Sequence, residues 1–383
     1  MIYLDNSATT RPFDGVIEAM DRNMREAYFN ASAAYGPALG VEREVRDCRR
    51  AIAAQIGARE EEIVFTCGGT EGDNLAILGA AQALRRPGVF ACSDIEHPAV
   101  AETIARVRQL GHEVRRLPVD ARGVLDLAAC EEALNGDTRF VSCMQVSNET
   151  GAIQPVAALS RIAKAKNPDA LVHVDGVQGF MRVPVHMQRE GIDLYTLSGH
   201  KIHGPKGVGA LAVRKGVRLA PQETGGGQER GLRSGTVNST GIAGLLAAVR
   251  EMAGRPEDVA RLSEMKARLV RELADVPGLR VNGPQPGEAD SAPHILSLTF
   301  EGVRGEVLRN ALEGEGVLVS TGSACASHKQ KVSASLLSMG LTAEQADGTI
   351  RVSLGLFNTM AEMDETARRI ARLVAALRQY RRR

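Results

Sequence analysis

The sequence predicts an α/β protein in which a large domain, built on a mostly parallel β-sheet between helices, is followed by a smaller α+β domain. Short apolar runs alternate with amphipathic stretches from Glu62 onward, at a spacing typical of strand–helix–strand crossover units. After Pro221 this alternation gives way to a glycine-rich segment and then to a long helical region. With 383 residues the chain is longer than most single hydrophobic cores, so two domains are expected.

Two helices are predicted before the crossover units. Apolar residues at helical spacing indicate a helix over 15–27 and a charge-rich helix over 41–56, separated by the small and polar stretch 30–40. The alternating region then predicts strands at 63–66, 88–93, 114–117, 138–146 and 170–174, and helices at 70–82, 99–109, 125–134 and 156–165. Two further strands, at 192–197 and 208–213, are joined by a turn.

The C-terminal elements follow the glycine-rich segment 223–236, which we expect to form an irregular loop close to a ligand or another backbone. They are a helical region from 242 to about 276, strands at 294–300 and 316–320, and helices at 305–313 and 364–380. We therefore place the large domain at 15–250 and assign residues 1–14 and 251–383 to the small domain.

Composition and charge exclude several classes of function. The 47 basic and 46 acidic side chains leave a net charge of +1, and aromatic residues make up only 3%, so no nucleic-acid partner is expected. No apolar run is long enough to span a membrane, and the first residues have no signal-peptide pattern. The six cysteines form no C-x-x-C pair and no zinc-finger spacing. We expect a cytoplasmic protein with reduced thiols and no metal site.

The turn between the strands predicted at 192–197 and 208–213 carries Lys201, in the stretch Ser198-Gly-His-Lys201. A desolvated lysine on a rigid turn can form a Schiff base with a carbonyl, including the aldehyde of pyridoxal phosphate. For this motif alone, an exposed turn with a solvated lysine is the commoner explanation. The case for a cofactor therefore depends on the other strand ends.

Four other polar residues follow predicted strands of the same sheet, namely Thr70, His97, Asn148 and Asp175. In an open α/β sheet, ligands bind at the edge where the carboxyl ends of the strands meet. Taken singly, Thr70 is weak evidence, because many such turns are rich in Gly and Thr only to cap the helix, and Asp175 is equally well explained as a helix cap. His97 alone is better explained as an ordinary loop histidine. Together they indicate one site for a phosphorylated aromatic aldehyde. The helix start at Thr70 would hold the phosphate, and Asp175 would pair with a protonated pyridine nitrogen.

Two C-terminal residues have chemistry that suits a reaction at such a site. Cys325 stands in a small and polar stretch after a predicted strand. A thiol beside a basic cofactor site gains thiolate character and can act as a nucleophile, although an incidental loop cysteine explains it equally well. Arg351 lies inside a strand-like run. Its guanidinium group suits bidentate capture of a substrate carboxylate, and a structural ion pair is the alternative.

Taken together, these motifs resemble the cysteine desulfurases, which are pyridoxal-phosphate enzymes of the class V aminotransferase group. The resemblance runs nearly end to end, and the stretch around Cys325 is similar to that of the NifS/IscS-type subgroup. The matching motifs are Tyr3-Leu-Asp-Asn-Ser-Ala-Thr-Thr10, Phe65-Thr-Cys-Gly-Gly-Thr-Glu71, Glu96-His97, Ser147-Asn-Glu-Thr-Gly151, His173-Val-Asp175, Ser198-Gly-His-Lys201, Gly225-Gly-Gly-Gln-Glu-Arg-Gly-Leu-Arg-Ser-Gly-Thr236, Gly322-Ser-Ala-Cys325 and Arg351-Val-Ser-Leu-Gly355.

This resemblance implies the fold type I architecture of pyridoxal-phosphate-dependent transferases and a role for each matching residue. Lys201 would be the Schiff-base lysine, Asp175 the partner of the pyridine nitrogen, and His97 a residue that stacks on the ring and assists proton transfer. The remaining cofactor contacts would come from Asn148 and Gln178 at the ring oxygen, from Gly69, Thr70, Ser198 and His200 at the phosphate, and from Thr236 of the second subunit of a homodimer. Asn6 and Arg351 would bind the substrate carboxylate.

The implied reaction converts L-cysteine to L-alanine, with the sulfur kept as a persulfide on Cys325. A sulfur-acceptor protein, either an iron–sulfur scaffold or a thiolation relay protein, would then take the sulfur. A selenocysteine lyase, an aminotransferase with an incidental Cys325, and a non-catalytic sulfur-assembly scaffold are the alternatives. The stretches 30–35 and 328–332 depart from the family pattern, which leaves the choice of acceptor open.

Overall fold

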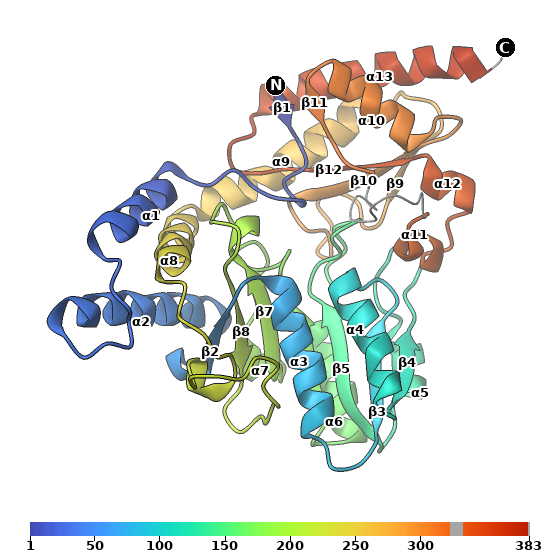
Figure 1. The fold of residues 1–383 in the computed structure, drawn as a ribbon. Coiled ribbons are helices and arrows are strands. Elements are labelled where there is room, and N and C mark those ends of the chain that lie inside the picture. The colour runs from blue at the N-terminus through green and yellow to red at the C-terminus, as the bar shows by residue number, and fades with distance from the viewer. Residues whose placement is uncertain (322–331, 382–383) are drawn as a thin grey trace.

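The computed structural model describes residues 1–321 and 332–381, and a seven-stranded sheet forms its larger part (Figure 1). In spatial order the strands are β2 (Ile63–Thr66), β8 (Gly209–Val213), β7 (Leu194–Ser198), β6 (Leu171–Asp175), β5 (Thr138–Met144), β3 (Val89–Ser93) and β4 (Glu113–Leu117). Only β8 runs against its neighbours, so the other six strands end at the same edge of the sheet. The predicted mostly parallel sheet is confirmed.

Helices cover both faces of this sheet, which explains why its central strands are apolar along their whole length. One face packs on α3 (Gly69–Ala83) and α4 (Pro98–Gln109), through strand residues such as Val64 and Phe140. The next residues along the same strands, Phe65 and Val141, point to the opposite face. That face is covered by α2 (Gly36–Ile56), α5 (Leu127–Ala133), α6 (Val156–Lys166) and α8 (Ser239–Ala253).

The helix boundaries differ from the sequence prediction at prolines. Helix α2 begins at Gly36 rather than at 41, because Pro37 occupies the first turn, where no N–H donor is needed. The single helical region expected over 242–276 is two helices, α8 and α9 (Pro256–Glu272). Pro256 starts α9, and its ring cannot continue the preceding helix. A small helix, α7 (Met187–Glu190), precedes β7, and α1 (Asp14–Glu26) lies where predicted.

A second, antiparallel sheet with the order β12-β10-β9 lies above the carboxyl edge of the large sheet in Figure 1. Its strands are β9 (Leu279–Asn282), β10 (Ile295–Phe300) and β12 (Thr349–Ser353), with α9, α10 (Gly305–Gly314) and α13 (Met360–Arg381) around it. The N-terminal strand β1 (Ile2–Tyr3) pairs in parallel with β11 (Val317–Leu318). Helices α11 (Ala334–Ser338) and α12 (Ala343–Asp347) and strand β9 were not predicted. One continuous buried cluster joins both parts of the molecule, so the domain boundaries stay a prediction.

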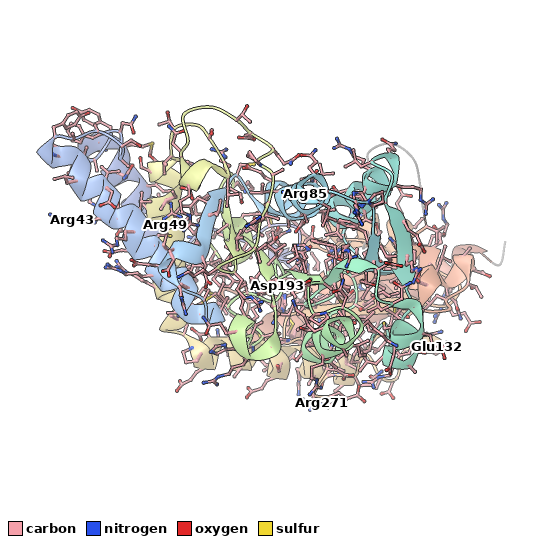
Figure 2. All side chains as sticks on the ribbon, turned by 90° about the horizontal axis from the view of Figure 1, so that it is seen from below. Arg43, Arg49, Arg85, Glu132, Asp193 and Arg271 are labelled. Carbon is pink, nitrogen blue, oxygen red and sulfur yellow. The ribbon has the colours of Figure 1, made fainter. Side chains whose placement is uncertain are left out.

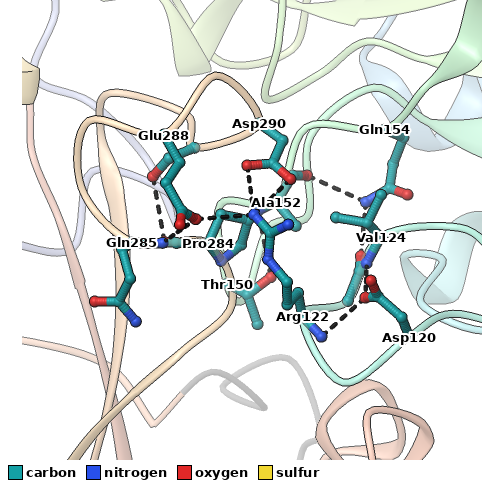
Figure 3. A network of polar contacts seen from close by, with 12 residues as sticks. Asp120, Arg122, Val124, Thr150, Ala152, Gln154, Pro284, Gln285, Glu288 and Asp290 are labelled. Atoms are coloured by element: carbon teal, nitrogen blue, oxygen red, sulfur yellow. Dashed lines mark hydrogen bonds and ion pairs between the residues drawn. The ribbon is translucent and has the colours of Figure 1, made fainter.

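A polar network connects the turn after β4 with the segment that precedes β10 (Figure 3). Arg122 binds the carboxylate of Asp290 at 2.7 Å and that of Glu288 at 2.8 Å. Backbone bonds from Ile153 to Asp290 and from Ala292 to Gly151, both 2.8 Å, add to this link. The loop that follows β5, which carries Asn148, is therefore held between the two sheets.

Most charged side chains lie on the outside, as Arg43, Arg85, Glu132 and Arg271 do in Figure 2. Asp193, in the middle of that view, is fully buried. Its carboxylate is bound by Lys164 at 2.5 Å and by Arg214 at 3.0 Å, which compensates its burial. In the part of the chain that the structure describes, no helix is both long and apolar enough to cross a bilayer.

Candidate active site

The predicted site residues of the large sheet gather at its carboxyl edge. Asp175 and Ser198 are the last residues of β6 and β7. His97 caps α4 just after β3, Asn148 follows β5, and Gly69 and Thr70 begin α3 after β2. Because parallel strands end together here, residues separated by over a hundred positions share one edge.

Lys201 ends a single turn of 3₁₀ helix, Gly199–Lys201, between β7 and β8. Its side chain is half-buried, and its Nζ donates hydrogen bonds to the carbonyl oxygens of Ser7 at 2.5 Å and of Ala8 at 2.9 Å. Its own carbonyl accepts a hydrogen bond from Arg182. Both the backbone and the amine of Lys201 are thus held by hydrogen bonds, which favours the predicted cofactor lysine over a solvated lysine on an exposed turn.

Asp175 is a buried carboxylate at the edge of the sheet. Its Oδ1 accepts a hydrogen bond from the backbone N–H of Val177 at 2.9 Å. Burial, and then the neighbouring carboxyl group of Asp73, raise the pKa of Asp175 to about 6. An ionised carboxylate in such a place needs a cationic partner. A protonated pyridine nitrogen meets this requirement.

His97 is fixed in orientation by its role as the N-cap of α4. Its Nδ1 accepts a hydrogen bond from the backbone N–H of Ala99 at 3.1 Å, which places the ring proton on Nε2. Burial lowers the pKa of His97, so the ring is neutral near pH 7. A neutral, oriented imidazole can stack on a planar ring and exchange a proton through Nε2.

The start of α3 offers an anion site. The backbone N–H groups of Gly69 and Thr70 lie in the first helical turn, where they have no acceptor within the helix, and the N-cap Gly68 provides no side chain to satisfy them. A Cβ added at Gly69 would lie 2.7 Å from Val177, so the backbone approaches its neighbours closely here. Ser198 lies beside this turn, because a Cβ at Gly68 would be 3.7 Å from its Oγ.

His200 and Gln178 extend the same site. The Nδ1 of His200 lies 3.2 Å from the hydroxyl of Thr9, and burial lowers the pKa of the ring to about 4, so it is neutral. Gln178 donates to the carbonyl of Ser7 at 3.0 Å, while its Oε1 is buried and has no hydrogen-bond partner among the described residues. A ring hydroxyl could satisfy this oxygen. The donor set therefore fits pyridoxal phosphate, with N–H groups for the phosphate, a carboxylate for the ring nitrogen and an amine for the aldehyde.

The two residues predicted to bind the substrate carboxylate are engaged by the protein itself. Arg351, in β12, donates to the carbonyl of Asn148 at 2.8 Å and pairs with Asp5 at 2.9 Å, and its Nε is buried without a partner among the described residues. Asn6 donates its amide hydrogens to the Ser353 carbonyl at 3.0 Å and to Asn358 Oδ1 at 3.3 Å. Carboxylate binding by either residue stays a prediction and requires an exchange of these partners.

The N-terminal segment 5–10 connects the cofactor end and the substrate end of this site. Its Ser7 carbonyl binds Lys201, and its Thr10 N–H donates to the carbonyl of His200 at 2.9 Å. On the other side, Asp5 forms a parallel bridge with Ser353 of β12. One short segment thus holds Lys201 of the large sheet next to β12 of the small sheet.

Two predicted residues are not brought into this set. Thr236 is exposed, and no hydrogen bond in the described part of the chain joins it to the others, so its contribution to a second subunit stays a prediction. Cys325 lies in 322–331, outside the described residues. The described residues next to that stretch are anchored beside the site. Ser320 pairs with the backbone of Arg351, and Ser333 Oγ lies 2.6 Å from a carboxylate oxygen of Glu149, the residue after Asn148.

Sequence reasoning missed a second set of polar residues, which lies beneath the site. Asp73, Glu96, His173 and Thr196 are all buried on the α3–α4 side of the sheet. Glu96 accepts hydrogen bonds from Ser93 and from the backbone N–H of Met144. The available signal was the presence of polar residues inside otherwise apolar elements, namely His173 in β6, Thr196 in β7 and Asp73 in α3.

Comparisons with known proteins identify the family of this chain. The sequence matches the aminotransferase class-V family over residues 2–365. It is 38% identical to the cysteine desulfurase IscS of Dictyoglomus turgidum over 380 residues, covering 98% of this chain and 95% of that protein. It is also 38% identical to a cysteine desulfurase of a Nostoc species, covering 99% and 94% of the two chains.

Solved structures show the same fold over nearly the whole chain. A NifS-like protein superposes with a TM-score of 0.91 at 37% identity, covering 98% of this chain and 99% of that one. The protein SspA, solved in complex with cysteine, superposes with a TM-score of 0.81 at 32% identity, covering 94% and 100%. The chain therefore belongs to the class V aminotransferase family of pyridoxal-phosphate enzymes, and within it to the cysteine desulfurases.

Proposed function

We propose that this protein converts L-cysteine to L-alanine and keeps the sulfur as a persulfide on Cys325. The observation that carries the proposal is the convergence of Lys201, Asp175 and His97 at one sheet edge, beside the helix start at Gly69. An amine, a buried acid and a neutral imidazole are the groups that pyridoxal-phosphate chemistry on an amino acid requires.

Pyridoxal phosphate, when bound, supplies an electron sink for negative charge at the α-carbon of an amino acid. Asp175 holds the proton of the ring nitrogen, and the first turn of α3 binds the phosphate. The amine of Lys201 takes the α-proton of the substrate, and His97 exchanges protons through Nε2. These residues act from fixed positions, because each is held by a backbone hydrogen bond.

Cys325 would accept the sulfur. Its thiolate attacks the substrate sulfur, so that an S–S bond forms as the C–S bond breaks. The electron pair of the broken bond stays with the β-carbon, which takes up a proton. Lys201 returns a proton to the α-carbon, and alanine leaves. The positions of Ser320 and Ser333 support this role, since both ends of the stretch that carries Cys325 are anchored beside Arg351 and Asn148.

The persulfide would then pass to an acceptor protein, either an iron–sulfur scaffold or a thiolation relay protein. We also propose a homodimer, in which Thr236 of each subunit completes the phosphate site of the other. A cytoplasmic location belongs to the same proposal, because a reducing compartment keeps the thiol of Cys325 available.

The test compares alanine formation from L-cysteine by the parent protein, Lys201→Ala and the control Lys206→Ala, which removes an exposed lysine five residues away. The parent and the control should bind pyridoxal phosphate with a visible absorbance band and agree in rate within about twofold. Lys201→Ala should lose that band and at least about 99% of the rate, because no other group in the proposed site offers the amine. Unchanged alanine formation in Lys201→Ala would sink the proposal.

A further inference from the structure

The residue two positions after Lys201 combines an unusual backbone conformation with a buried side chain, and the reaction as described gives it no role. His203 follows the 3₁₀ turn Gly199–Lys201 and has a φ of 62°. This left-handed region favours glycine, because a residue with a side chain is strained there. The conformation lets the N–H of Gly204 return to the carbonyl of Gly199 at 3.0 Å, which closes the lysine turn. A histidine at a position that suits glycine indicates that its side chain is used.

The imidazole of His203 is fully buried, and both of its nitrogens have partners. Its Nδ1 lies 2.8 Å from the carbonyl oxygen of Arg11, and its Nε2 accepts the backbone N–H of Leu356 at 3.3 Å. Because a carbonyl oxygen can only accept, Nδ1 carries the ring proton and Nε2 offers its lone pair. Only the neutral ring makes both hydrogen bonds, since a proton on Nε2 would face a second donor.

The surroundings of this ring favour its neutral form and fix its plane. Phe13 stacks on it with the ring centroids 4.6 Å apart, and the ring of Phe357 lies nearly perpendicular to it at 5.4 Å. Burial, and then the charge of Arg182, lower the pKa of His203 to about 4. The imidazole is therefore uncharged near pH 7, and two aromatic rings and two hydrogen bonds hold it in one orientation.

His203 joins three segments that are distant in the sequence. Its N–H donates to the hydroxyl of Thr10 at 2.7 Å, and its carbonyl accepts the N–H of Phe13 at 3.0 Å, so the lysine turn is bound to the N-terminal part of the chain. Leu356, which donates to the imidazole, follows β12, the strand that carries Arg351. The side chain of His203 is thus a direct link between the lysine turn of the large sheet and the segment that leaves the small sheet.

We propose that His203 is a positioning residue, whose neutral imidazole fixes the lysine turn to the segment after β12 and so keeps the amine of Lys201 in reach of a substrate bound at Arg351. This inference rests on the proposed function. The amine of Lys201 itself binds the carbonyls of Ser7 and Ala8, which belong to the N-terminal segment that His203 also holds. Since proton transfer is sensitive to a displacement of about 1 Å, loosening the link should slow the reaction more than it weakens substrate binding.

The first measurement is hydrogen–deuterium exchange of the protein without cofactor, read by mass spectrometry. His203→Gly removes the ring and suits the left-handed backbone, so a loss of protection comes from the missing side chain. Peptides that cover 199–204 and 354–358 should both exchange at least about fivefold faster than in the parent. Unchanged exchange of either peptide would overturn the link. Because neither cofactor nor substrate is present, this result does not depend on the proposed function.

The second measurement is alanine formation from L-cysteine over a range of concentrations, which separates kcat from KM. His203→Gly, and His203→Asn, whose amide is too short to reach Leu356, should lower kcat at least about tenfold and change KM less than about threefold. His203→Gln, which offers an acceptor in place of Nε2, should keep kcat within about threefold of the parent. A parent-like kcat in Asn, or equal losses in Asn and Gln, would contradict the proposal. Should Gly fail to fold, Asn and Gln still decide.

The matched control is His112→Ala. His112 is also buried, lies 4.8 Å from the ring of Phe90 and accepts the backbone N–H of Gly88 at 3.2 Å, but it precedes β4, at the opposite edge of the sheet from the site. This variant should lower the melting temperature and keep kcat within about twofold of the parent. A fall in kcat as large as that of His203→Gly would show that lost stability alone explains the effect. If the parent forms no alanine, the proposed function fails, while the exchange result still decides the link.

Discussion

At the scale of single residues, burial sets the charge states on which the chemistry depends. Asp175, His97 and Lys201 each form one or two hydrogen bonds with backbone groups. The pKa of Asp175 is raised and that of His97 is lowered, in both cases mainly by loss of solvent. The protein thus has a carboxylate whose ionised form a bound cation would stabilise, and an imidazole that is neutral when the cofactor binds.

Glu96 gives a prediction for the pH dependence of stability. Burial raises its pKa from 4.5 to about 8, so its protonated form is favoured in the folded state. The resulting contribution of Glu96 to the free energy of unfolding is complete below about pH 4.5 and is lost as the pH rises through about 8. It amounts to a few kcal/mol at most. Glu96→Gln should therefore reduce the fall in melting temperature between pH 6 and pH 9.

The matched control is Glu102→Gln, which changes an exposed glutamate on α4 and should leave the fall in melting temperature as in the parent. An equal pH dependence in Glu96→Gln and the parent would contradict the assigned cause.

Sequence reasoning could name the residues of this site but not their partners. Lys201, His97 and Asp175 were predicted because each follows a strand in a short motif. The contacts of Arg351 with Asp5 and of Asn6 with Ser353 join residues about 350 positions apart. Nothing in local spacing indicates that these side chains meet, because the return of β12 to the N-terminal segment is a property of the whole fold.

At the scale of elements, the glycine-rich loop 223–236 is tied down at a few points. The carboxylate of Glu229 binds Arg49 of α2 at 2.6 and 2.9 Å and accepts the backbone N–H of Phe65 in β2 at 2.9 Å. Farther along, Arg233 pairs at 2.9 Å with Glu71, which also accepts the N–H of Cys67. The loop that carries Thr236 is thereby fixed to β2 and α3, which flank the proposed phosphate site.

Removing the charge of Glu229 should therefore loosen this loop. Glu229→Gln breaks a largely buried ion pair, since the carboxylate side chain is only 4% exposed, and we expect a loss of about 2–4 kcal/mol in the free energy of unfolding. The control Asp21→Asn breaks an exposed pair with Arg25 and should cost less than about 1 kcal/mol. Urea denaturation of both variants measures the difference, and equal losses would show that Glu229 is not an anchor.

The elements were predictable where a periodic pattern and a stop signal coincide. Strand β2 was predicted at its observed bounds. A charged turn precedes this four-residue run and a glycine-rich turn follows it, so both of its ends could be read from the sequence. Helices α11 and α12 were missed, since each has only five residues and no helical period can be read from so short a stretch. Pro256 was a readable break in the long helical region, and it was overlooked because apolar residues continue at helical spacing on both sides.

At the scale of the whole molecule, the two sheets carry different parts of the proposed site. The large sheet carries Lys201, Asp175 and His97 at its carboxyl edge, and the small sheet carries Arg351. The N-terminal segment 5–10 and the network around Arg122 connect the two. The fold class was predictable because alternating strands and helices permit few arrangements, whereas the packing of the small sheet against the large one depends on contacts between distant segments.

The central claim is that the sulfur of cysteine is transferred to Cys325 as alanine forms. The most direct measurement incubates the protein, loaded with pyridoxal phosphate, with ³⁵S-labelled L-cysteine and counts protein-bound sulfur that dithiothreitol releases. The parent and Cys67→Ser, which changes an exposed cysteine of the described chain, should carry close to one label per subunit and release alanine. Cys325→Ser should carry none. Full labelling of Cys325→Ser, or labelling of the parent without alanine, would contradict the account.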